Sequence, residues 1–398
     1  MGRNRPKGGL LGGSDILRLP DTPEVSGTAG ADSIDVVFTD PSDVGGGSIT
    51  SRTASATDSG GTVSTATGTG TTVTISSLST GSFTIGGFVT NDFGNSVASA
   101  TVSVSVFLDR ALFFGGHGAA NDNRIDYIAI ASTANAQDFG DLGTLIEGSS
   151  GGAASSTRGV VGAKNSNVIQ YVTFASLGNT SDFGDRTLSN NAYTCLSNST
   201  RGVFGGGNQT TRNEMEYITI ASTGNTSDFG DLTVARKELS AMATSTRGVY
   251  VGGENAASAG ENTLDYITIA STGNATDFGN LLAANMYSAA TSSSTRGVIM
   301  GGYVSSSNSN VIQYITMAST GNATDFGDLV ITRRQGGGNN NNIRAVIAGG
   351  VGDTGGDAQK SIDYFTIAST GNASDFGDLT STSAHGMMSC SANHGGLH

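Results

Sequence analysis

The stretch from Arg247 to Leu281 reads RGVYVGG, then a polar loop, then LDYITIASTGNATDFGNL, and variants of it recur along residues 110–398. Its arginine recurs at Arg110, Arg158, Arg201, Arg247, Arg296 and Arg344. Its tyrosine recurs at Tyr127, Tyr171, Tyr217, Tyr266, Tyr314 and Tyr364, and its phenylalanine, always 12 residues later, at Phe139, Phe183, Phe229, Phe278, Phe326 and Phe376. Six copies spaced by 43–50 residues predict a repeat architecture in which these side chains are structural.

Each copy contains four short β-type segments. In the copy quoted above they are residues 239–245, 247–253, 264–271 and 275–281. A Gly-Gly pair ends the second segment, and STGN forms a tight turn between the third and the fourth. Four antiparallel strands per copy, repeated six times, predict the blades of a β-propeller.

The phase of the repeat predicts how the propeller closes. The repeat region begins with a second strand, residues 110–116 (RALFFGG), and ends with a first strand, residues 386–392 (GMMSCSA). His394 lies 18 residues after Phe376, which is the usual distance from this phenylalanine to the next arginine. We therefore expect residues 110–116 to pair with residues 386–392 and close six blades, leaving no exposed sheet edge. An open solenoid is the structural alternative.

The order of these signals resembles a kelch repeat, in which a hydrophobic strand ending in Gly-Gly is followed by Tyr and a second aromatic residue. The resemblance covers residues 110–398 and implies a kelch-like (galactose-oxidase-like) propeller with phenylalanine where kelch families usually have tryptophan.

Residues 20–107 precede the repeats and predict a separate β-sandwich of seven short strands. Alternating apolar residues occur at 33–38, 72–75, 83–89 and 101–107, with turn residues between them. Pro20, SIDVVFTDP at 33–41, GGGSI at 45–49 and LSTGSFTIGGFVTNDFGNS at 78–96 resemble a fibronectin type III domain. The fold class expected for the whole chain is therefore all-β.

Charge and composition exclude several functional classes. The chain has 33 acidic and 20 basic residues, a net charge of −13, which argues against a nucleic-acid partner. No apolar run is long enough to insert into a membrane, and residues 1–13 lack a signal-peptide core. The cysteines, Cys195 and Cys390, form no pattern and are expected to be small buried side chains. Residues 1–19 instead form a basic, Gly-rich arm, and Arg3, Arg5 and Lys7 are its expected anchoring residues.

The copies differ mainly in one loop, which predicts a binding face. The arginine-to-tyrosine distance varies as 17, 13, 16, 19, 18 and 20 residues, whereas the tyrosine-to-phenylalanine distance never changes. Loops between second and third strands should share one face with the connections between blades, so that face carries the variation. Its candidate binding residues are His117, Asn121, Arg124, Asn208, Gln209, Arg212, Glu254, Glu261, Tyr303, Asn308, Asp353, Asp357 and Lys360. Loop drift without selection for binding is the alternative.

No motif in the chain predicts catalysis. Asp-Phe-Gly at 138–140 and its five copies echo a kinase signature, but six copies in hairpins indicate a buried Phe and an Asp bonded to turn amides. Paired carboxylates such as Asp228 and Asp231 could also recruit a cation. His117, His385, His394 and His398 give no convincing copper site with Tyr and Cys. We expect no enzyme activity, cofactor or metal site. The stretch GGGNNNN at 336–342 stands where the other copies have the small apolar residues of an inner strand, and the sequence does not indicate its role.

Units such as TRGVFGGG, followed by EYITIASTGN and DFGDL, resemble the tandem repeats of structural proteins in marine cyanophages and related tailed phages. The resemblance implies a virion structural protein (tail fibre, appendage or decoration component), assembled in the host cytoplasm and present in multiple copies. It implies that residues 1–19 and the sandwich contact other virion proteins, while the propeller faces a glycan or protein of the host surface. A bacterial surface or exported glycan-binding adhesin, and a carbohydrate-active oxidase or hydrolase, remain the alternatives.

Overall fold

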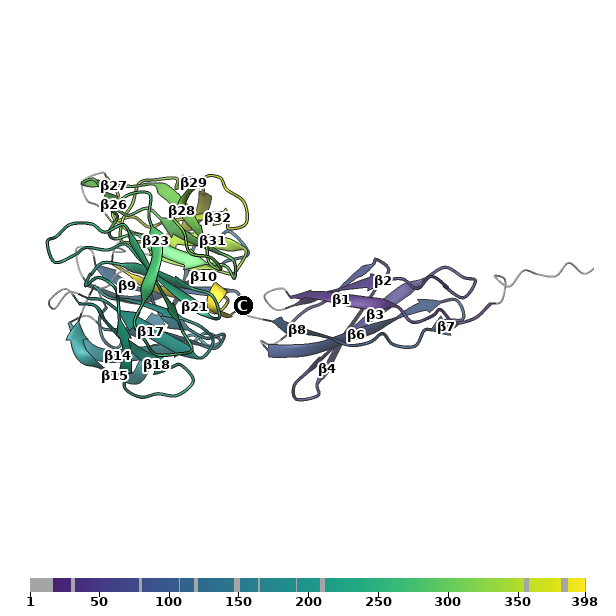
Figure 1. The fold of residues 1–398 in the computed structure, drawn as a ribbon. Coiled ribbons are helices and arrows are strands. Elements are labelled where there is room, and N and C mark those ends of the chain that lie inside the picture. The colour runs from purple at the N-terminus through teal and green to yellow at the C-terminus, as the bar shows by residue number, and fades with distance from the viewer. Residues whose placement is uncertain are drawn as a thin grey trace, which may run out of the picture. The chain divides into compact units, whose positions relative to one another are not determined.

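The protein is all-β, as the sequence predicts. A computed structural model describes residues 17–29, 33–78, 81–106, 108–117, 121–146, 151–163, 165–190, 192–207, 212–353, 358–380 and 386–397. The chain divides into two compact units between Leu108 and Asp109 (Figure 1). Among the described residues the one helix is the 3-10 turn η1 (Gly395–Leu397), so none of them forms a helix that could cross a membrane. The arm residues Arg3, Arg5 and Lys7 lie outside the described part of the chain.

The first unit contains two antiparallel sheets. One sheet has the order β1 (Glu24–Ala29), β2 (Ile34–Thr39), β5 (Thr72–Ile75). The other runs β4 (Val63–Gly68), β3 (Ser51–Asp58), β6 (Gly81–Asn91), β7 (Gly94–Asn95), with β8 (Val102–Val106) also paired to β6. Both sheets contribute alternate residues to one core that includes Val36, Phe38 and Ile85, because successive side chains of a strand point to opposite faces.

The described part of the second unit contains six four-stranded antiparallel sheets, numbered here in chain order. Sheet 1 contains β34 (Met388–Ser391), β9 (Arg110–His117), β10 (Asn121–Ala129) and β11 (Gln137–Asp141). Sheet 2 contains β12 (Ala153–Ala154), β13 (Arg158–Gly162), β14 (Ser166–Thr173) and β15 (Ser181–Asn190). Sheet 3 contains β16 (Thr194–Ser197), β17 (Arg201–Gly205), β18 (Glu214–Thr219) and β19 (Ser227–Asp231). Sheet 4 contains β20 (Ser240–Ala243), β21 (Arg247–Val251), β22 (Thr263–Thr268) and β23 (Thr276–Asn280). Sheet 5 contains β24 (Ala289–Ser292), β25 (Arg296–Met300), β28 (Val311–Thr316) and β29 (Thr324–Asp328). Sheet 6 contains β30 (Gly337–Asn340), β31 (Arg344–Ala348), β32 (Ser361–Thr366) and β33 (Ser374–Asp378). A short hairpin of β26 (Tyr303–Val304) and β27 (Ser307–Asn308) extends from sheet 5.

The C-terminal strand belongs to the same sheet as the first repeat strand. In the register of β34 with β9, Met388 lies opposite Phe114 and Ser391 opposite Ala111. This is the pairing between residues 110–116 and 386–392 that the repeat phase predicts. No second strand begins at His394, because the chain turns into η1 instead.

The first strands of the six sheets contact one another in a cyclic order. β12, β16, β20, β24, β30 and β34 are neighbours in that sequence, and β34 also contacts β12. Apolar clusters lie between sheets 3 and 4, 4 and 5, and 5 and 6, and a further one joins sheets 6 and 1 through Phe113, Ile128, Val346 and Phe376. Burying one such phenylalanine contributes about 1.5–3 kcal/mol relative to leaving it exposed.

The repeated arginine is a link between neighbouring sheets. Each one stacks on the tyrosine of its own sheet, with its guanidinium carbon 4.3–4.8 Å from the ring centre. Each also donates to a backbone carbonyl of the next sheet, as Arg247 does to Met317 at 2.8 Å. The arginine of sheet 6, Arg344, donates to Ile130 of sheet 1 at 2.9 Å, so the last sheet bonds to the first in the same way.

A second repeated link comes from the residue before each tyrosine. This position holds a buried Asp, Glu or Gln, and its side-chain oxygen accepts a backbone N–H of the preceding sheet at 2.9–3.3 Å. The residues are Asp126, Gln170, Glu216, Asp265, Gln313 and Asp363. The bond from Thr380 to Asp126 again joins sheet 6 to sheet 1.

A third link explains the Asp-Phe-Gly motif. The phenylalanine is buried and meets its tyrosine edge-on, with ring centres 5.8–6.1 Å apart in all six copies. The glycine allows close approach to the next sheet, since a Cβ at Gly279 would lie 2.4 Å from the Gly321 carbonyl oxygen. An asparagine in that neighbouring turn, such as Asn322, accepts the backbone N–H two residues after the phenylalanine.

The stretch GGGNNNN forms the first strand of sheet 6 and the turn after it, and its amides are used in bonds to other sheets. Asn339 donates to the Leu112 carbonyl at 3.1 Å, and Asn340 donates to the Ser292 carbonyl at 2.7 Å. Asn341 donates to Asp109 at 2.8 Å, and Asn342 accepts the N–H of Ser294 at 2.7 Å. These asparagines therefore bond this strand and turn to both neighbouring sheets.

Candidate functional site

The length-variable loops and the connections between sheets lie together, as the sequence predicts. Isolated bridges join Lys237 to Glu254, Met286 to Tyr303 and Arg334 to Val351. In each pair, the first residue belongs to the connection that follows a fourth strand, and the second belongs to the loop after the second strand of the next sheet along the chain. We call this side of the second unit the loop face.

Five of the predicted binding residues bond within their own part of the loop face. Arg124 pairs with Asp122 at 2.8 Å, Arg212 with Glu214 at 3.1 Å, and Lys360 with Asp378 at 3.0 Å. Glu254 pairs with Lys237 at 3.2 Å, and Glu261 accepts the Asn255 amide at 2.7 Å. Asn208, Gln209 and Asp357, with the side chains of His117 and Asn121, lie outside the described part of the structure.

Three predicted residues meet in one groove on the loop face. Tyr303, Asn308 and Asp353 line a groove of about 300 Å³ between the β26–β27 hairpin of sheet 5 and sheet 6. Arg334, which the sequence analysis did not select, lies in the same groove. Ser306, Ser307, Val351 and Gly352 complete its lining. We call this feature the Tyr303 groove.

The Arg334 side chain is held in place within this groove. Its guanidinium carbon lies 4.8 Å from the centre of the Tyr303 ring, and Nη1 donates to Asn308 Oδ1 at 2.9 Å. Asn308 in turn donates to the Val351 carbonyl at 3.1 Å. Asp353, which also lines the groove, accepts the Thr332 hydroxyl at 2.5 Å. The groove thus presents a fixed cation, a carboxylate and hydroxyl groups.

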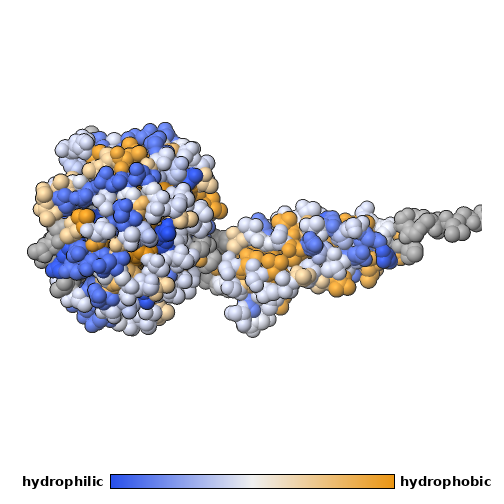
Figure 2. Space-filling model, viewed as in Figure 1, coloured by the Kyte–Doolittle hydropathy of each residue, from blue (hydrophilic) through white to orange (hydrophobic). Residues whose placement is uncertain are grey.

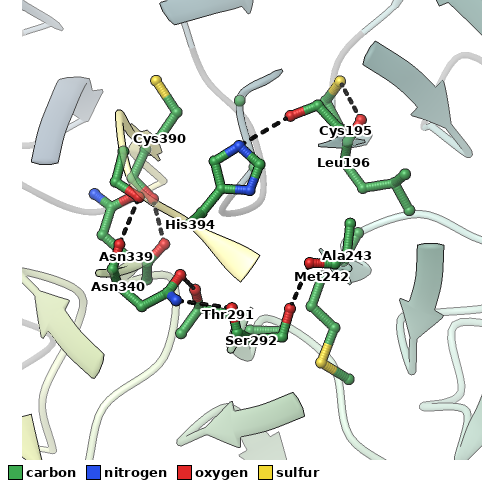
Figure 3. Close-up of a pocket in the computed structure, with 18 residues that line it drawn as sticks. Cys195, Leu196, Met242, Ala243, Thr291, Ser292, Asn339, Asn340, Cys390 and His394 are labelled. Atoms are coloured by element: carbon green, nitrogen blue, oxygen red, sulfur yellow. Dashed lines mark hydrogen bonds between the residues drawn. The ribbon is translucent and has the colours of Figure 1, made fainter. Parts of the chain in front are cut away.

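A second small cavity lies among the first strands. It has a volume of about 50 Å³ and is lined by small and polar residues of several sheets, including Ser292, Asn340 and Ser391. Figure 3 shows the His394 ring pointing into this cavity. His394 Nε2 lies 3.0 Å from the Ala154 carbonyl, and Nδ1 accepts the Gly396 N–H at 3.1 Å. The C-terminal turn therefore fills the end of the cavity away from the loop face.

The side chains of this cavity are poorly suited to nucleophilic chemistry. Burial raises the pKa of the Cys195 and Cys390 thiols well above the ordinary range, so both stay protonated, and a thiol is a weak nucleophile and metal ligand. Both cysteines are free and buried, as the sequence predicts. Across the described ranges, no three His, Cys, Asp or Glu side chains come together as a metal site.

A third cavity, of about 100 Å³, borders the Arg186–Glu216 ion pair. The two side chains are 4% and 8% exposed and lie 3.0 Å apart. Arg186 Nη1 and Arg212 Nε are buried without a hydrogen-bond partner, and Glu214 and Asp228 also line the space. With carboxylates on its wall, this cavity suits bound water better than an anion.

The predicted role of the aspartate in the Asp-Phe-Gly motif, a bond to turn amides, is wrong. Its side chain is exposed in all six copies, for example at Asp277, while the turn amide bonds to the asparagine of the neighbouring sheet instead. The asparagines of the Asn-x-Ser/Thr triplets at 179, 225, 274, 322 and 372 all have this bonding role.

The displayed surface of the second unit is of mixed polarity (Figure 2). On the side of the second unit that Figure 2 displays, hydrophilic residues lie between smaller apolar areas. Comparison with models of known protein families gives no match for this chain, and comparison with curated proteins gives none either.

Sequence reasoning missed Arg334 and the role of His394. Arg334 lies eight residues after Phe326 and Lys237 eight residues after Phe229, so the basic residue shared by these two of the six connections was a usable signal. His394 had no such signal, because its contacts depend on how the C-terminal turn enters the space between the first strands.

Proposed function

We propose that residues 110–398 form a closed, six-bladed, kelch-like β-propeller, and that residues 20–107 form a fibronectin type III-like sandwich. The propeller is supported by the six four-stranded sheets, the cyclic contacts of their first strands and the β34–β9 pairing. The sandwich is supported by two antiparallel sheets that share one apolar core.

We infer that the chain is a non-enzymatic structural protein of a tailed-phage virion, a tail fibre, appendage or decoration component. The observation that carries this proposal is how the repeated residues are used. The repeated Arg, Tyr and Phe, with the buried residue before each Tyr, all make contacts within or between sheets, whereas length variation lies mainly in the loops of the loop face. Such a division between scaffold and variable loops is typical of a protein that displays a surface.

In this proposal the basic residues Arg3, Arg5 and Lys7 anchor the chain, and other virion proteins contact residues 1–19 and the sandwich. The protein assembles in the host cytoplasm and is carried in multiple copies. Many copies on one particle would give avidity for a host glycan or protein without high affinity at a single site.

Cryo-electron microscopy of purified particles, with antibody labelling of the chain, tests the proposal. We expect label and repeat-unit density on particles, and loss of both when residues 1–19 are deleted. Full occupancy after the deletion would refute the anchoring role. Label on cells that carry no phage would favour a bacterial adhesin, and turnover of a carbohydrate substrate by the purified chain would overturn the non-enzymatic assignment.

A further inference from the structure

We propose that the Tyr303 groove binds a saccharide that carries a carboxylate. The inference deepens the proposed display function and rests on it for the source of the saccharide, while binding itself can be measured on the purified chain. The groove volume of about 300 Å³ lies at the lower end of the range for small-molecule sites, about 300–1,000 Å³.

Arg334 differs from the other described Lys and Arg residues in the groups that surround its guanidinium. Six of the described arginines are the repeated residues that bond to backbone carbonyls. Every other Lys or Arg in the described part of the chain, Arg334 excepted, has a carboxylate within 4.0 Å. In a chain with a net charge of −13, a cation that faces a groove with no carboxylate of the described residues within 4.0 Å is unusual.

The same guanidinium is already positioned for a ligand. The Tyr303 ring and Asn308 fix its plane, and only Nη1 is used by Asn308. A planar guanidinium matches a carboxylate with two parallel N–H bonds, and prior ordering of the side chain lowers the entropy lost on binding.

The remaining groups favour a saccharide over a simple anion. Asp353 lines the same groove and repels a small anion, but its carboxylate can accept a sugar hydroxyl. Ser306 and Ser307 add hydroxyl groups that both donate and accept. A ligand with one carboxylate near Arg334 and hydroxyls near Asp353 and the serines satisfies both charges.

The backbone of the hairpin is consistent with a ligand-contacting role. Ser305 and Ser306 form the tip of the hairpin with φ values of 48° and 68°, a conformation for which Asn and Gly are the usual residues. Non-glycine residues held in this region persist where the surroundings fix them, and such residues cluster at binding sites.

Titration of the full chain with the methyl glycosides of glucuronic acid and glucose, followed by ligand-observed NMR, tests this proposal. We expect saturable binding of the glucuronide with a Kd on the order of millimolar, and at least tenfold weaker binding of the glucoside. Arg334→Met should weaken glucuronide binding at least tenfold. The matched control Arg18→Met removes an exposed cation of the first unit, far from the groove in the sequence, and should leave binding unchanged. Thermal unfolding of both variants checks that the fold is intact.

Four outcomes would overturn the proposal. They are equal affinity for the two glycosides, no saturable binding of the glucuronide, undiminished binding by Arg334→Met, and binding of acetate as tight as that of the glucuronide, which would indicate a simple anion site. Particle labelling and the deletion of residues 1–19 do not depend on this groove, so failure here and failure of the proposed function are distinguishable.

Discussion

At the scale of single residues, one position departs from the repeat in an informative way. Three residues after the repeated phenylalanine, five copies have a buried leucine: Leu142, Leu232, Leu281, Leu329 and Leu379. The remaining copy has Arg186, a buried side chain that pairs with the buried Glu216 at 3.0 Å. The position equivalent to Glu216 holds a neutral Gln170 or Gln313 in two other sheets. The Arg186–Glu216 ion pair therefore occupies two positions that hold a leucine and a glutamine between other neighbouring sheets.

We predict that Arg186→Leu lowers the free energy of unfolding by about 3–5 kcal/mol, because it leaves the Glu216 carboxylate buried without its partner. The double variant Arg186→Leu with Glu216→Gln should recover most of this loss, since it recreates the pair found in other sheets. Urea denaturation of the two variants measures both values. A double variant as unstable as the single one would contradict this explanation.

The buried carboxylate of Asp126 predicts a pH dependence. Burial raises its pKa above the usual value for Asp, although Thr380 opposes the shift with two hydrogen bonds. A raised pKa means that this group stabilises the fold below the pKa of the unfolded chain and loses that contribution as pH rises through the folded-state pKa.

We therefore expect the wild-type protein to lose stability relative to Asp126→Asn as the pH is raised from 3 to 7. Asn is a reasonable replacement because Gln170 and Gln313 serve the same role in other sheets. Unfolding free energies measured across this pH range test the sign. A constant difference between the two proteins would show that Asp126 has the same pKa in both states.

At the scale of elements, the glycine of the Asp-Phe-Gly motif connects the local turn to sheet packing. Gly279 has φ +147° and lies against the Gly321 carbonyl of the next sheet. The turn glycine Gly321 itself is open, because a Cβ there would meet nothing within 4 Å. The glycine of the motif and the turn glycine that it contacts in the next sheet therefore have opposite tolerance to substitution.

We predict that Gly279→Ala destabilises the protein by roughly 2–5 kcal/mol, from left-handed backbone strain and overpacking. Gly321→Ala is the matched control and should change stability by less than about 0.5 kcal/mol. Thermal unfolding of both variants gives the comparison. Equal shifts would mean that the close approach between sheets does not limit stability.

The strands could be predicted from the sequence better than the contacts between them. In the repeat quoted first, the expected segments 239–245, 247–253, 264–271 and 275–281 contain β20, β21 and β23, and all of β22 except Thr263. Alternation and glycine placement are local signals, so they fix these elements. The roles of the repeated Arg and of the asparagines at 339–342 were not predictable, because each depends on a residue of a neighbouring sheet.

The candidate site could also be predicted from the sequence only in part. Loop-length variation identified the loop face, and Tyr303, Asn308 and Asp353 were selected from it. Their convergence on Arg334 depends on how sheets 5 and 6 lie together, which a single sequence does not encode locally. Arg124, Arg212 and Lys360 were chosen by the same reasoning, yet each pairs with a nearby carboxylate.

At the scale of the whole molecule, the contacts between sheets 6 and 1 decide the stability of the repeat unit. Arg344 to Ile130, Thr380 to Asp126 and the β34–β9 pairing all bring together residues from opposite ends of the repeat region. Without β34, the β9 backbone would be left as an unpaired strand edge, which favours association between chains.

We predict that deleting residues 386–398 lowers the thermal stability and makes the protein self-associate more strongly than the full chain. Light scattering after gel filtration, together with thermal unfolding, measures both properties. Deletion of residues 393–398 alone is the control, because it leaves β34 in place. A monomeric 386–398 deletion with unchanged thermal stability would show that β34 is dispensable.

The most direct test of ring closure is a register-specific disulfide. Cys390 lies opposite Leu112 in the β34–β9 pair, and directly opposed residues of antiparallel strands are about 4.5–5.5 Å apart at Cα, within disulfide range. In a Cys195→Ala background, oxidation of Leu112→Cys should yield an intramolecular bond to Cys390 by peptide mass spectrometry. Ala111→Cys, whose side chain points to the opposite face, should give far less. Failure of Leu112→Cys to cross-link, or equal yields from the two variants, would contradict a ring closed by β34 and β9.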